Sequence, residues 1–358
     1  MENIYASKYL IFLFVAFCFS FLINKLFLNF SKNLGGRSKN ENTVRWASVT
    51  KPAFGGISFF IVFLLSYSAY PLFFDHGLTF ARPETLGILI ASTLAFLMGL
   101  ADDAYDTNPS LKFIVQFASA IVLIISGTYI QLFDSTVANY VITILWVVGM
   151  MNSINMLDNM DAISTLASIF AFASMLIVGA YSTDTQSIYF LLTSCMISGL
   201  VGFLYFNWNP SKMYMGDTGS QFLGIILSAM SIHFLWNPIS IVEEVAISKQ
   251  FVFVVLAFLI PLSDTTTVVI NRLAKGNSPF IGGKDHTTHH LSYLGFSDRQ
   301  VALIVGLIGS LNTLLIIYIL SIEDWSGMFT FLFGGYAFLV FLSLFLITKR
   351  TKPKSIQT

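Results

Sequence analysis

The sequence predicts an all-α, polytopic integral membrane protein with about eleven transmembrane helices and its polar motifs gathered in the odd-numbered loops. Of the 358 residues, 55% are hydrophobic and 11% are charged. A soluble domain carries about 25% charged residues. Windows of about 20 apolar residues, the length needed to cross a bilayer, recur along the whole chain. The net charge is zero, so no basic surface favours nucleic acid as a partner.

Eleven apolar windows account for the predicted spans. No small-residue cleavage site follows the first window, so we expect a retained span rather than a signal peptide. We expect residues 1–348 to form a single transmembrane domain and residues 349–358 a short basic tail. Cys18 and Cys195 lie inside apolar windows and are interpreted as packing residues. The windows are 8–30, 54–74, 86–101, 113–131, 139–157, 162–181, 186–206, 220–236, 249–271, 301–320 and 328–347.

Loop charge predicts the orientation of these spans. Each loop is numbered by the span that it follows. The odd-numbered loops and the C-terminal tail hold fifteen Lys and Arg residues, whereas the even-numbered loops and the N-terminus hold three. Because basic loops stay in the cytoplasm, the odd-numbered loops are predicted to face it. Every short polar motif lies in those same loops, which supports the span count.

The first two of these loops carry paired glycines and adjacent carboxylates. Loop one is basic and ends in residues 51–56, where two glycines allow a ligand to approach the backbone closely. The role of Lys51 within it is open. Loop three contains Asp102 and Asp103, and Lys112 opens the next span. Adjacent carboxylates beside hydrocarbon are costly unless a cation lies near them; a solvated cluster that caps a helix is the alternative.

Loop five carries Asn152, Asn155, Asp158 and Asp161 at intervals of three residues. On a helix this spacing places four polar side chains along one slowly drifting stripe. Two carboxylates and two amides at a membrane end are costly unless they contact a ligand or water. A polar seam buried between helices is the alternative.

Loop seven contains Asp217 among small residues, directly before an apolar run that begins at Phe222. Pro210, Gly216 and Gly219 exclude a continuous helix through this stretch. A carboxylate in this position can hold a hard cation, and the helix start can hold phosphate oxygens. The alternative is that Asp217 only caps the following helix.

Loop nine, residues 272–300, holds three of the five histidines within five positions: His286, His289 and His290. Their spacing would suit zinc, but no cysteine or third clear ligand accompanies them, and we assign them to phosphate contacts. Asp264 lies about two helical turns before Arg272, and we expect these two side chains to pair.

Together the five loops predict one cytoplasmic active site that combines carboxylates with Lys, His and amides. This mixture suits a Mg²⁺–pyrophosphate ligand, because carboxylates hold the metal while cations neutralise phosphate oxygens. A phosphorylated donor at the surface of a membrane protein indicates a lipid acceptor. A transporter is the rival class, and it would place ionisable groups near the bilayer midplane rather than at one face.

Over roughly residues 50 to 300, the motifs and their order resemble the polyprenyl-phosphate N-acetylhexosamine-1-phosphate transferases. The matching motifs are Gly99-Leu100-Ala101-Asp102-Asp103, Asn152-x-x-Asn155-x-x-Asp158-x-x-Asp161, Phe206-Asn207-x-x-Pro210, Met215-Gly216-Asp217-Thr218-Gly219-Ser220 and the His-rich loop. The resemblance implies ten or eleven spans in a bacterial inner membrane and dependence on Mg²⁺, with Mn²⁺ as a substitute. The implied partners are undecaprenyl phosphate, a UDP-N-acetylhexosamine and membrane lipid, with UMP as a product; a homodimer is left open.

Carried over by motif position, the resemblance implies three sets of site residues. The catalytic set is Asp102, Asp103 and Asp217, with Asp217 as the principal Mg²⁺ ligand and Asn155 or Asp158 as candidates for a second. The nucleotide-sugar set is Asn152, Asn155, Asp158, Asp161, Asn207 and Tyr214, with Asp161 towards the uracil and Tyr214 stacked on it. The phosphate set is Lys112, His286, His289 and His290.

Two motifs depart from the family's pattern. Asn159 and Ala162 replace the two glycines of its Asp-Gly-x-Asp-Gly motif, so the contacts to the sugar are not carried over. The loop-nine sequence differs from the triple-histidine form of the phospho-N-acetylmuramoyl-pentapeptide enzyme. It resembles the branch that starts O-antigen, enterobacterial common antigen or teichoic acid with UDP-N-acetylglucosamine. The expected mechanism is direct displacement; a two-step route with Asp102 or Asp103 as nucleophile is the alternative.

Overall fold

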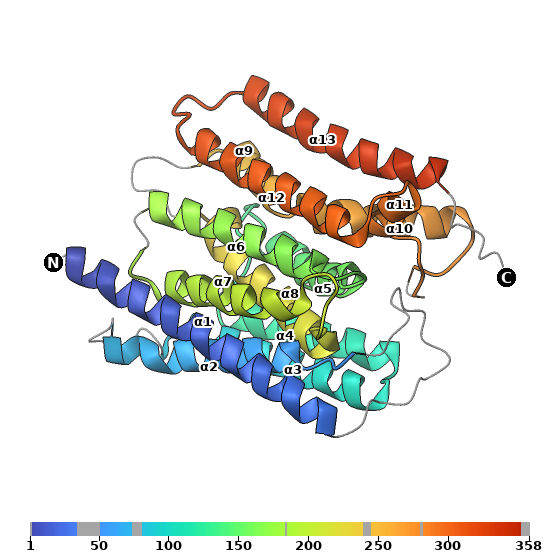
Figure 1. The fold of residues 1–358 in the computed structure, drawn as a ribbon. Coiled ribbons are helices and arrows are strands. Elements are labelled where there is room, and N and C mark those ends of the chain that lie inside the picture. The colour runs from blue at the N-terminus through green and yellow to red at the C-terminus, as the bar shows by residue number, and fades with distance from the viewer. Residues whose placement is uncertain are drawn as a thin grey trace.

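The computed structural model of the chain describes residues 2–33, 51–73, 81–182, 185–238, 245–279 and 282–351. In these ranges every regular element is a helix, and the long helices form one bundle (Figure 1). The helices are α1 (Glu2–Asn33), α2 (Gly55–Phe73), α3 (Pro83–Tyr105), α4 (Pro109–Ile125), α5 (Thr136–Leu157), α6 (Ile163–Tyr181), α7 (Ile188–Asn207), α8 (Gly216–Ser231) with a π-helical turn (Ile232–Trp236), α9 (Ile247–Ala257), α10 (Leu259–Ala274), α11 (Thr287–Tyr293), α12 (Asp298–Leu320) and α13 (Gly327–Arg350).

The predicted polytopic, all-helical class is confirmed. Among the described residues, nine helices are long and apolar enough to cross a membrane, or ten if the bent pair α9 and α10 is one span. The fourth predicted window, 113–131, corresponds to α4, whose 17 residues are fewer than the roughly 20 that span a bilayer. This helix ends six residues before the predicted boundary, because Gly127 turns the chain with φ +96°.

The predicted span over 249–271 corresponds to two helices joined at a break. The chain breaks at Phe258, and α9 and α10 meet at an angle of 78°. Pro261 supplies the cause, since proline has no N–H to donate to the carbonyl of Ala257 and its ring clashes with that carbonyl. Residues 34–50, most of the basic loop one, and residues 352–358 of the predicted tail lie outside the described residues.

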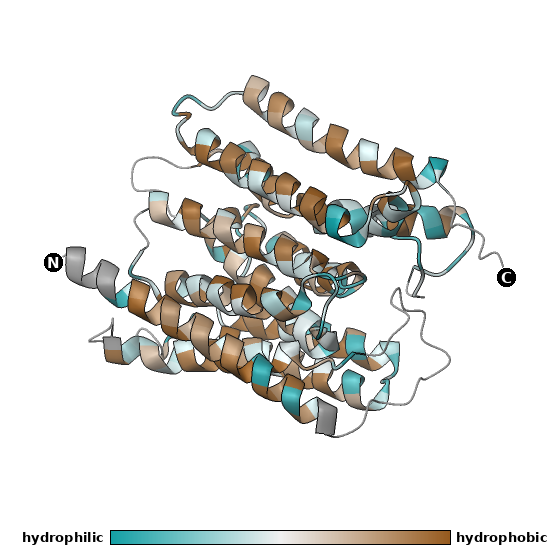
Figure 2. Ribbon diagram, in the orientation of Figure 1, coloured by the Kyte–Doolittle hydropathy of each residue, from teal (hydrophilic) through white to brown (hydrophobic). Residues whose placement is uncertain are grey.

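Helix α8 is the centre of the bundle. Of the residues in its most apolar 18-residue stretch, π-helical turn included, 94% are buried; the matching figure is 17% for α1 and for α13, which lie at the periphery. Helices α2, α3, α5 and α6 pack around α8. Hydrophobic residues line the long helices, and most hydrophilic residues gather at the end of the bundle where α3 ends and α4 begins (Figure 2). A buried central helix can therefore present its first residues at a defined place on that end.

The contact between α2 and α8 depends on a glycine pair. A Cβ added at Gly56 would lie 2.1 Å from the backbone nitrogen of Gly219, so only glycine allows this approach. We therefore expect Gly56→Ala to destabilise the protein by about 3 kcal/mol and to lower activity, because it pushes the start of α8 away. Thermal unfolding in detergent measures the first effect. Gly335→Ala in α13 is the matched control, since nothing lies within 4 Å of an added Cβ there; equal losses in both variants would contradict the prediction.

Candidate active site

Most of the motif residues predicted from the odd-numbered loops meet at this one end of the bundle. Helices α3, α5 and α7 end there, whereas α4 and α8 begin there. Asp102 and Asp103 lie in the last turn of α3, Asn155 in the last turn of α5 and Asp217 in the first turn of α8. The alternation of helix direction through the bundle brings these distant segments together.

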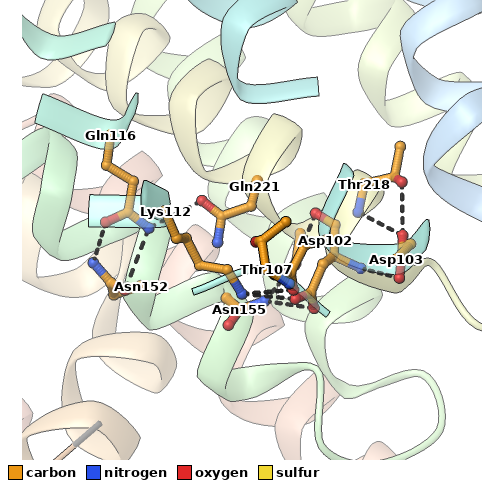
Figure 3. Close-up of polar contacts among 11 residues, drawn as sticks. Asp102, Asp103, Thr107, Lys112, Gln116, Asn152, Asn155, Thr218 and Gln221 are labelled. Carbon is orange, nitrogen blue, oxygen red and sulfur yellow. Dashed lines mark hydrogen bonds and ion pairs between the residues drawn. The ribbon is translucent and has the colours of Figure 1, made fainter. Parts of the chain in front are cut away.

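Lys112 joins two carboxylates from different helices. Its Nζ donates to Asp102 Oδ2 and to Asp217 Oδ2, each at 2.8 Å (Figure 3). Thr107 supports Asp102 by donating its backbone N–H and its hydroxyl to Oδ1. The Asp102 side chain is 11% exposed, whereas that of Asp217 is 32% exposed and remains accessible to a ligand. The lysine thus places one positive charge between two acids at the mouth of the site.

Amides from α4, α5 and α8 extend this network inwards. Asn155 Nδ2 donates to Asp217 Oδ1 and to the Ser220 hydroxyl, each at 2.9 Å. Behind it, Asn152 exchanges hydrogen bonds with Gln116, which also contacts Gln221 at 3.0 Å. Sequence reasoning had not singled out Gln221. The sequence held a signal for it, since Gln221 is an amide inside an apolar window. In the structure it is fully buried, where such a side chain requires polar partners.

Asp103 serves a different purpose from Asp102. Its Oδ1 accepts from the backbone N–H of Asp217, and its Oδ2 accepts from the N–H and hydroxyl of Thr218, at 3.1, 2.9 and 2.6 Å. The carboxylate therefore caps α8 from a neighbouring helix, satisfying amides that would otherwise lack partners. Gly216 permits this contact, since it has φ +71° and an added Cβ would lie 2.6 Å from Asp103 Oδ2.

Asp158 adds a further carboxylate to this end. Within the part of the chain that the structure describes, its side chain makes no hydrogen bond or ion pair. Burial, and then the negative charges of Asp217 and two further carboxylates, raise the pKa of Asp158 to about 8. The cluster of acids therefore exceeds the positive charge beside it, which favours binding of an additional cation.

Asp161 and Asn207 hold the loops of the site together. Asp161 is 8% exposed and accepts from Asn209, from the Ser211 N–H and from the Ser211 hydroxyl at 2.7–2.9 Å. Asn207, 2% exposed, accepts from the Ala162 N–H and donates to a carbonyl in loop seven. Both were predicted to line the nucleotide-sugar pocket, and the structure shows them tying loop five to loop seven.

Lys51 and Tyr214 lie next to this junction. Lys51 Nζ donates to the Ser211 hydroxyl at 2.9 Å, lies 3.7 Å from Asp161 Oδ2 and sits 5.1 Å from the centre of the Tyr214 ring. The backbone N–H of Tyr214 donates to the Pro52 carbonyl. The tyrosine is partly exposed and the lysine covers its ring, so the predicted stacking position is bordered by a cation.

The predicted pairing of Asp264 with Arg272 is wrong. Arg272 makes two hydrogen bonds to Asp285, at 2.9 and 2.7 Å, whereas Asp264 contacts His286 Nδ1 at 2.8 Å. Burial would raise the pKa of Asp285, but the hydrogen bonds and charge of Arg272 lower it. The spacing along α10 could not reveal these partners, because Asp285 and His286 come within reach only when loop nine folds back onto α10.

The three histidines of loop nine face different surroundings. His286 is held by Asp264, and His290 Nδ1 contacts the Thr351 hydroxyl at the end of α13 at 2.5 Å. His289 is buried beside His286, and burial followed by the charge of His286 lowers its pKa to about 3, so it is neutral at physiological pH. The structure joins this loop to loop five through Thr288, which donates to Asn159.

The donor chemistry of the site fits Mg²⁺. Asp217, Asn155 and Asp158 offer hard oxygen atoms, and the Lys112 ammonium already shows that this position accepts a cation between acids. In the described ranges no three His, Cys, Asp or Glu side chains form a metal-binding group. Mg²⁺ needs no such group, because proteins often bind it through one or two carboxylates and leave its other positions to substrate phosphates and water.

Comparisons with known proteins agree with this picture. Residues 85–235 match the model of the family described as glycosyl transferase family 4. The chain is 25% identical over 287 residues to the probable undecaprenyl-phosphate N-acetylglucosaminyl 1-phosphate transferase of Bacillus subtilis, covering 78% of this chain and 76% of that protein. It is 28% identical over 240 residues to the decaprenyl-phosphate N-acetylglucosaminephosphotransferase of Mycobacterium leprae, covering 61% and 60%. It is 29% identical over 289 residues to the phospho-N-acetylmuramoyl-pentapeptide-transferase of Staphylococcus saprophyticus, covering 72% and 84%.

The fold and the polar end of the bundle define a multi-pass membrane protein with a charged site where its helices meet the surface. The matched family covers α3 to the π-helical turn, which includes the Lys112 network and the capped start of α8. Over these residues, 85–235, the chain matches glycosyl transferase family 4.

Proposed function

We propose that the protein transfers N-acetylglucosamine-1-phosphate from its UDP derivative to undecaprenyl phosphate and releases UMP. The observation that carries this proposal is the Lys112 bridge between Asp102 and Asp217, at an end of the bundle where a membrane lipid and a soluble nucleotide can both arrive. The named relatives act on polyprenyl phosphates or on a phospho-sugar, which supports the same reaction class here.

In the proposed reaction, an oxygen of the lipid phosphate attacks the β-phosphorus of the donor. A new P–O bond forms while the bond from that phosphorus to the bridging oxygen breaks, and the oxygen leaves with UMP. Lys112 neutralises phosphate oxygens, and Asn155 holds the Asp217 carboxylate in place. Bound Mg²⁺, held by Asp217 with Asn155 or Asp158, would supply further neutralisation of charge. Such transfer needs mainly positioning, so no Ser or Cys nucleophile is required.

The two-step alternative uses a carboxylate as a covalent nucleophile. Asp103 is poorly suited, because both of its oxygens already accept hydrogen bonds from α8. Both oxygens of Asp102 accept hydrogen bonds as well, from Thr107 and Lys112, so neither acid offers a free oxygen as nucleophile. Incubation with donor alone distinguishes the schemes, since only the two-step route yields UMP and a phospho-sugar adduct before the lipid is added.

We also propose the orientation and membrane of the protein. If α4 and the bent pair α9 and α10 each cross once, the chain has eleven spans, and the site faces the cytoplasm of a bacterial cell as the loop charges predict. Residues 1–348 then form one catalytic domain. Accessibility labelling of single cysteines placed in loops three and four measures this; labelling of both from the same side would refute it.

The sugar is tested with a panel of donors. We expect purified protein with undecaprenyl phosphate and Mg²⁺ to release UMP from UDP-N-acetylglucosamine at least about tenfold faster than from UDP-N-acetylmuramoyl-pentapeptide, because loop nine lacks three consecutive histidines. The muramoyl substrate is the second candidate, since a relative with that activity is 29% identical. The reverse preference would establish it. Failure to release UMP from any donor would favour the transporter class.

A further inference from the structure

One buried acid near the site has a role that the proposed reaction does not use. Asp264, in α10, is 0% exposed. Its Oδ1 accepts from the backbone N–H and the hydroxyl of Thr287, at 2.8 and 2.6 Å. Its Oδ2 lies 2.8 Å from His286 Nδ1. One carboxylate therefore holds both the first turn of α11 and the imidazole ring that precedes it.

This acid is attached firmly to the end of the bundle that carries the candidate active site. Ser153 in α5 donates to the Pro261 carbonyl of α10 at 2.9 Å and accepts from Thr265 at 2.8 Å. Two residues after His286, Thr288 donates to Asn159 in loop five at 2.8 Å. His286 is thus fixed relative to α5, whose last turn carries Asn155.

The chemistry of the contact determines which imidazole nitrogen is available. A carboxylate accepts hydrogen bonds and donates none, so Nδ1 of His286 must carry the proton. Nε2 is then the only ring nitrogen left for another partner. It accepts a hydrogen bond when the ring is neutral and donates one when the ring is charged.

We propose that Asp264 is a positioning residue that fixes the tautomer and the ring orientation of His286, so that the ring, when it carries both protons, donates from Nε2 to the phosphates of the donor. The contact of His286 with those phosphates rests on the proposed function, whereas the tautomer follows from this structure alone. Thr287 strengthens the arrangement, because the same carboxylate sets the backbone and the ring of adjacent residues.

A second acid on the same segment provides a matched control. Asp285 pairs with Arg272 through two hydrogen bonds, and Arg272 also donates to the Pro279 carbonyl. This pair anchors loop nine to α10 but makes no hydrogen bond to the His286 ring. Asp285 directly precedes His286 in the chain, yet of the two acids only Asp264 contacts the imidazole ring.

Asp264→Asn tests the proposal through a forced change of tautomer. The N–H of Thr287 is an obligatory donor, so the new side chain must turn its carbonyl oxygen to Thr287 and its NH₂ to His286. Nδ1 must then accept, and the proton moves to Nε2. Spectra of the imidazole nitrogens in protein with isotopically labelled histidine report this directly, and loss of the signal in His286→Gln assigns it.

We expect a protonated Nδ1 in the wild type, a protonated Nε2 in Asp264→Asn and an unchanged tautomer in Asp285→Asn. UMP release in Asp264→Asn should fall on the order of 10- to 100-fold in kcat, with KM for the lipid unchanged. Asp264→Glu should restore the Nδ1–H form and part of the rate. Because glutamate keeps a carboxylate as the hydrogen-bond acceptor, Asp264→Glu is informative even if Asp264→Asn does not fold.

Three results would overturn the proposal: an unprotonated Nδ1 in the wild type, an unchanged tautomer in folded Asp264→Asn, or an equal change in Asp285→Asn. Absence of UMP release by the wild type would refute the proposed function instead. In that case the spectra still decide whether Asp264 fixes the His286 tautomer.

Discussion

Asp217→Asn is expected to reduce turnover by roughly a thousandfold, equivalent to about 4 kcal/mol, while the protein still folds. The amide keeps an oxygen for Asn155, but its NH₂ group faces the Lys112 ammonium and cannot hold a cation. Folding is spared because removing this charge relieves the repulsion on Asp158. UMP release measured over a range of Mg²⁺ concentrations, together with thermal unfolding in the same detergent, checks both parts.

Asp106→Asn is the control for this experiment. Asp106 follows Asp102 and Asp103 in the chain but is exposed, and its backbone has φ 53°, a conformation that asparagine tolerates well. We expect its activity to equal that of the wild type. Substantial Mg²⁺-dependent turnover in Asp217→Asn would refute the assignment of Asp217 as a metal ligand.

The adjacent acids Asp102 and Asp103 are expected to fail in different ways when each is replaced. Asp103→Ala leaves the N–H groups of Asp217 and Thr218 without their acceptor, which should cost about 2–3 kcal/mol of stability. Because the first turn of α8 then loosens, half-maximal activity should require more Mg²⁺. Asp102→Asn should lower kcat by about a hundredfold with a smaller loss of stability, because it removes one of two acceptors for Lys112.

Thermal unfolding and a Mg²⁺ titration of UMP release, carried out on both variants, separate these effects. High Mg²⁺ should restore part of the activity of Asp103→Ala, since the metal-binding carboxylate of Asp217 is still present. If Asp103→Ala is as stable as the wild type and inactive at every Mg²⁺ concentration, Asp103 takes part in the chemistry and does not merely position Asp217.

The sequence identified the polar motifs because each interrupts an apolar span, where an uncompensated polar group is costly. It did not reveal which role each residue of a motif has. Asp102 and Asp103 are neighbours in one motif, yet one contacts Lys112 and the other caps α8. Asp161 likewise matched a pocket residue by position and is held by the loop-seven residue Ser211. The partner of each carboxylate depends on how separate helices dock, which local sequence does not encode.

For the fold too, local sequence revealed some features, whereas others depend on how the helices pack. Hydropathy alone located most of the long apolar helices, since a bilayer span requires such a helix whatever its neighbours are. The number of apolar residues did not reveal that Pro261 breaks the ninth window, or that α8 is central while α1 and α13 are peripheral. Those features follow from side-chain packing between helices.

By itself, therefore, the sequence determined a polytopic membrane protein and a set of polar motifs that resemble those of the polyprenyl-phosphate N-acetylhexosamine-1-phosphate transferases. Only the tertiary structure decided that Lys112 bridges Asp102 and Asp217, that Asp103 secures α8 and that Asp264 holds His286. The physical reason is the length scale of the interactions. Transfer of a helix into lipid sums over about 20 residues of one segment. A hydrogen bond between carboxylate and ammonium instead requires two side chains from different helices to meet within about 3 Å.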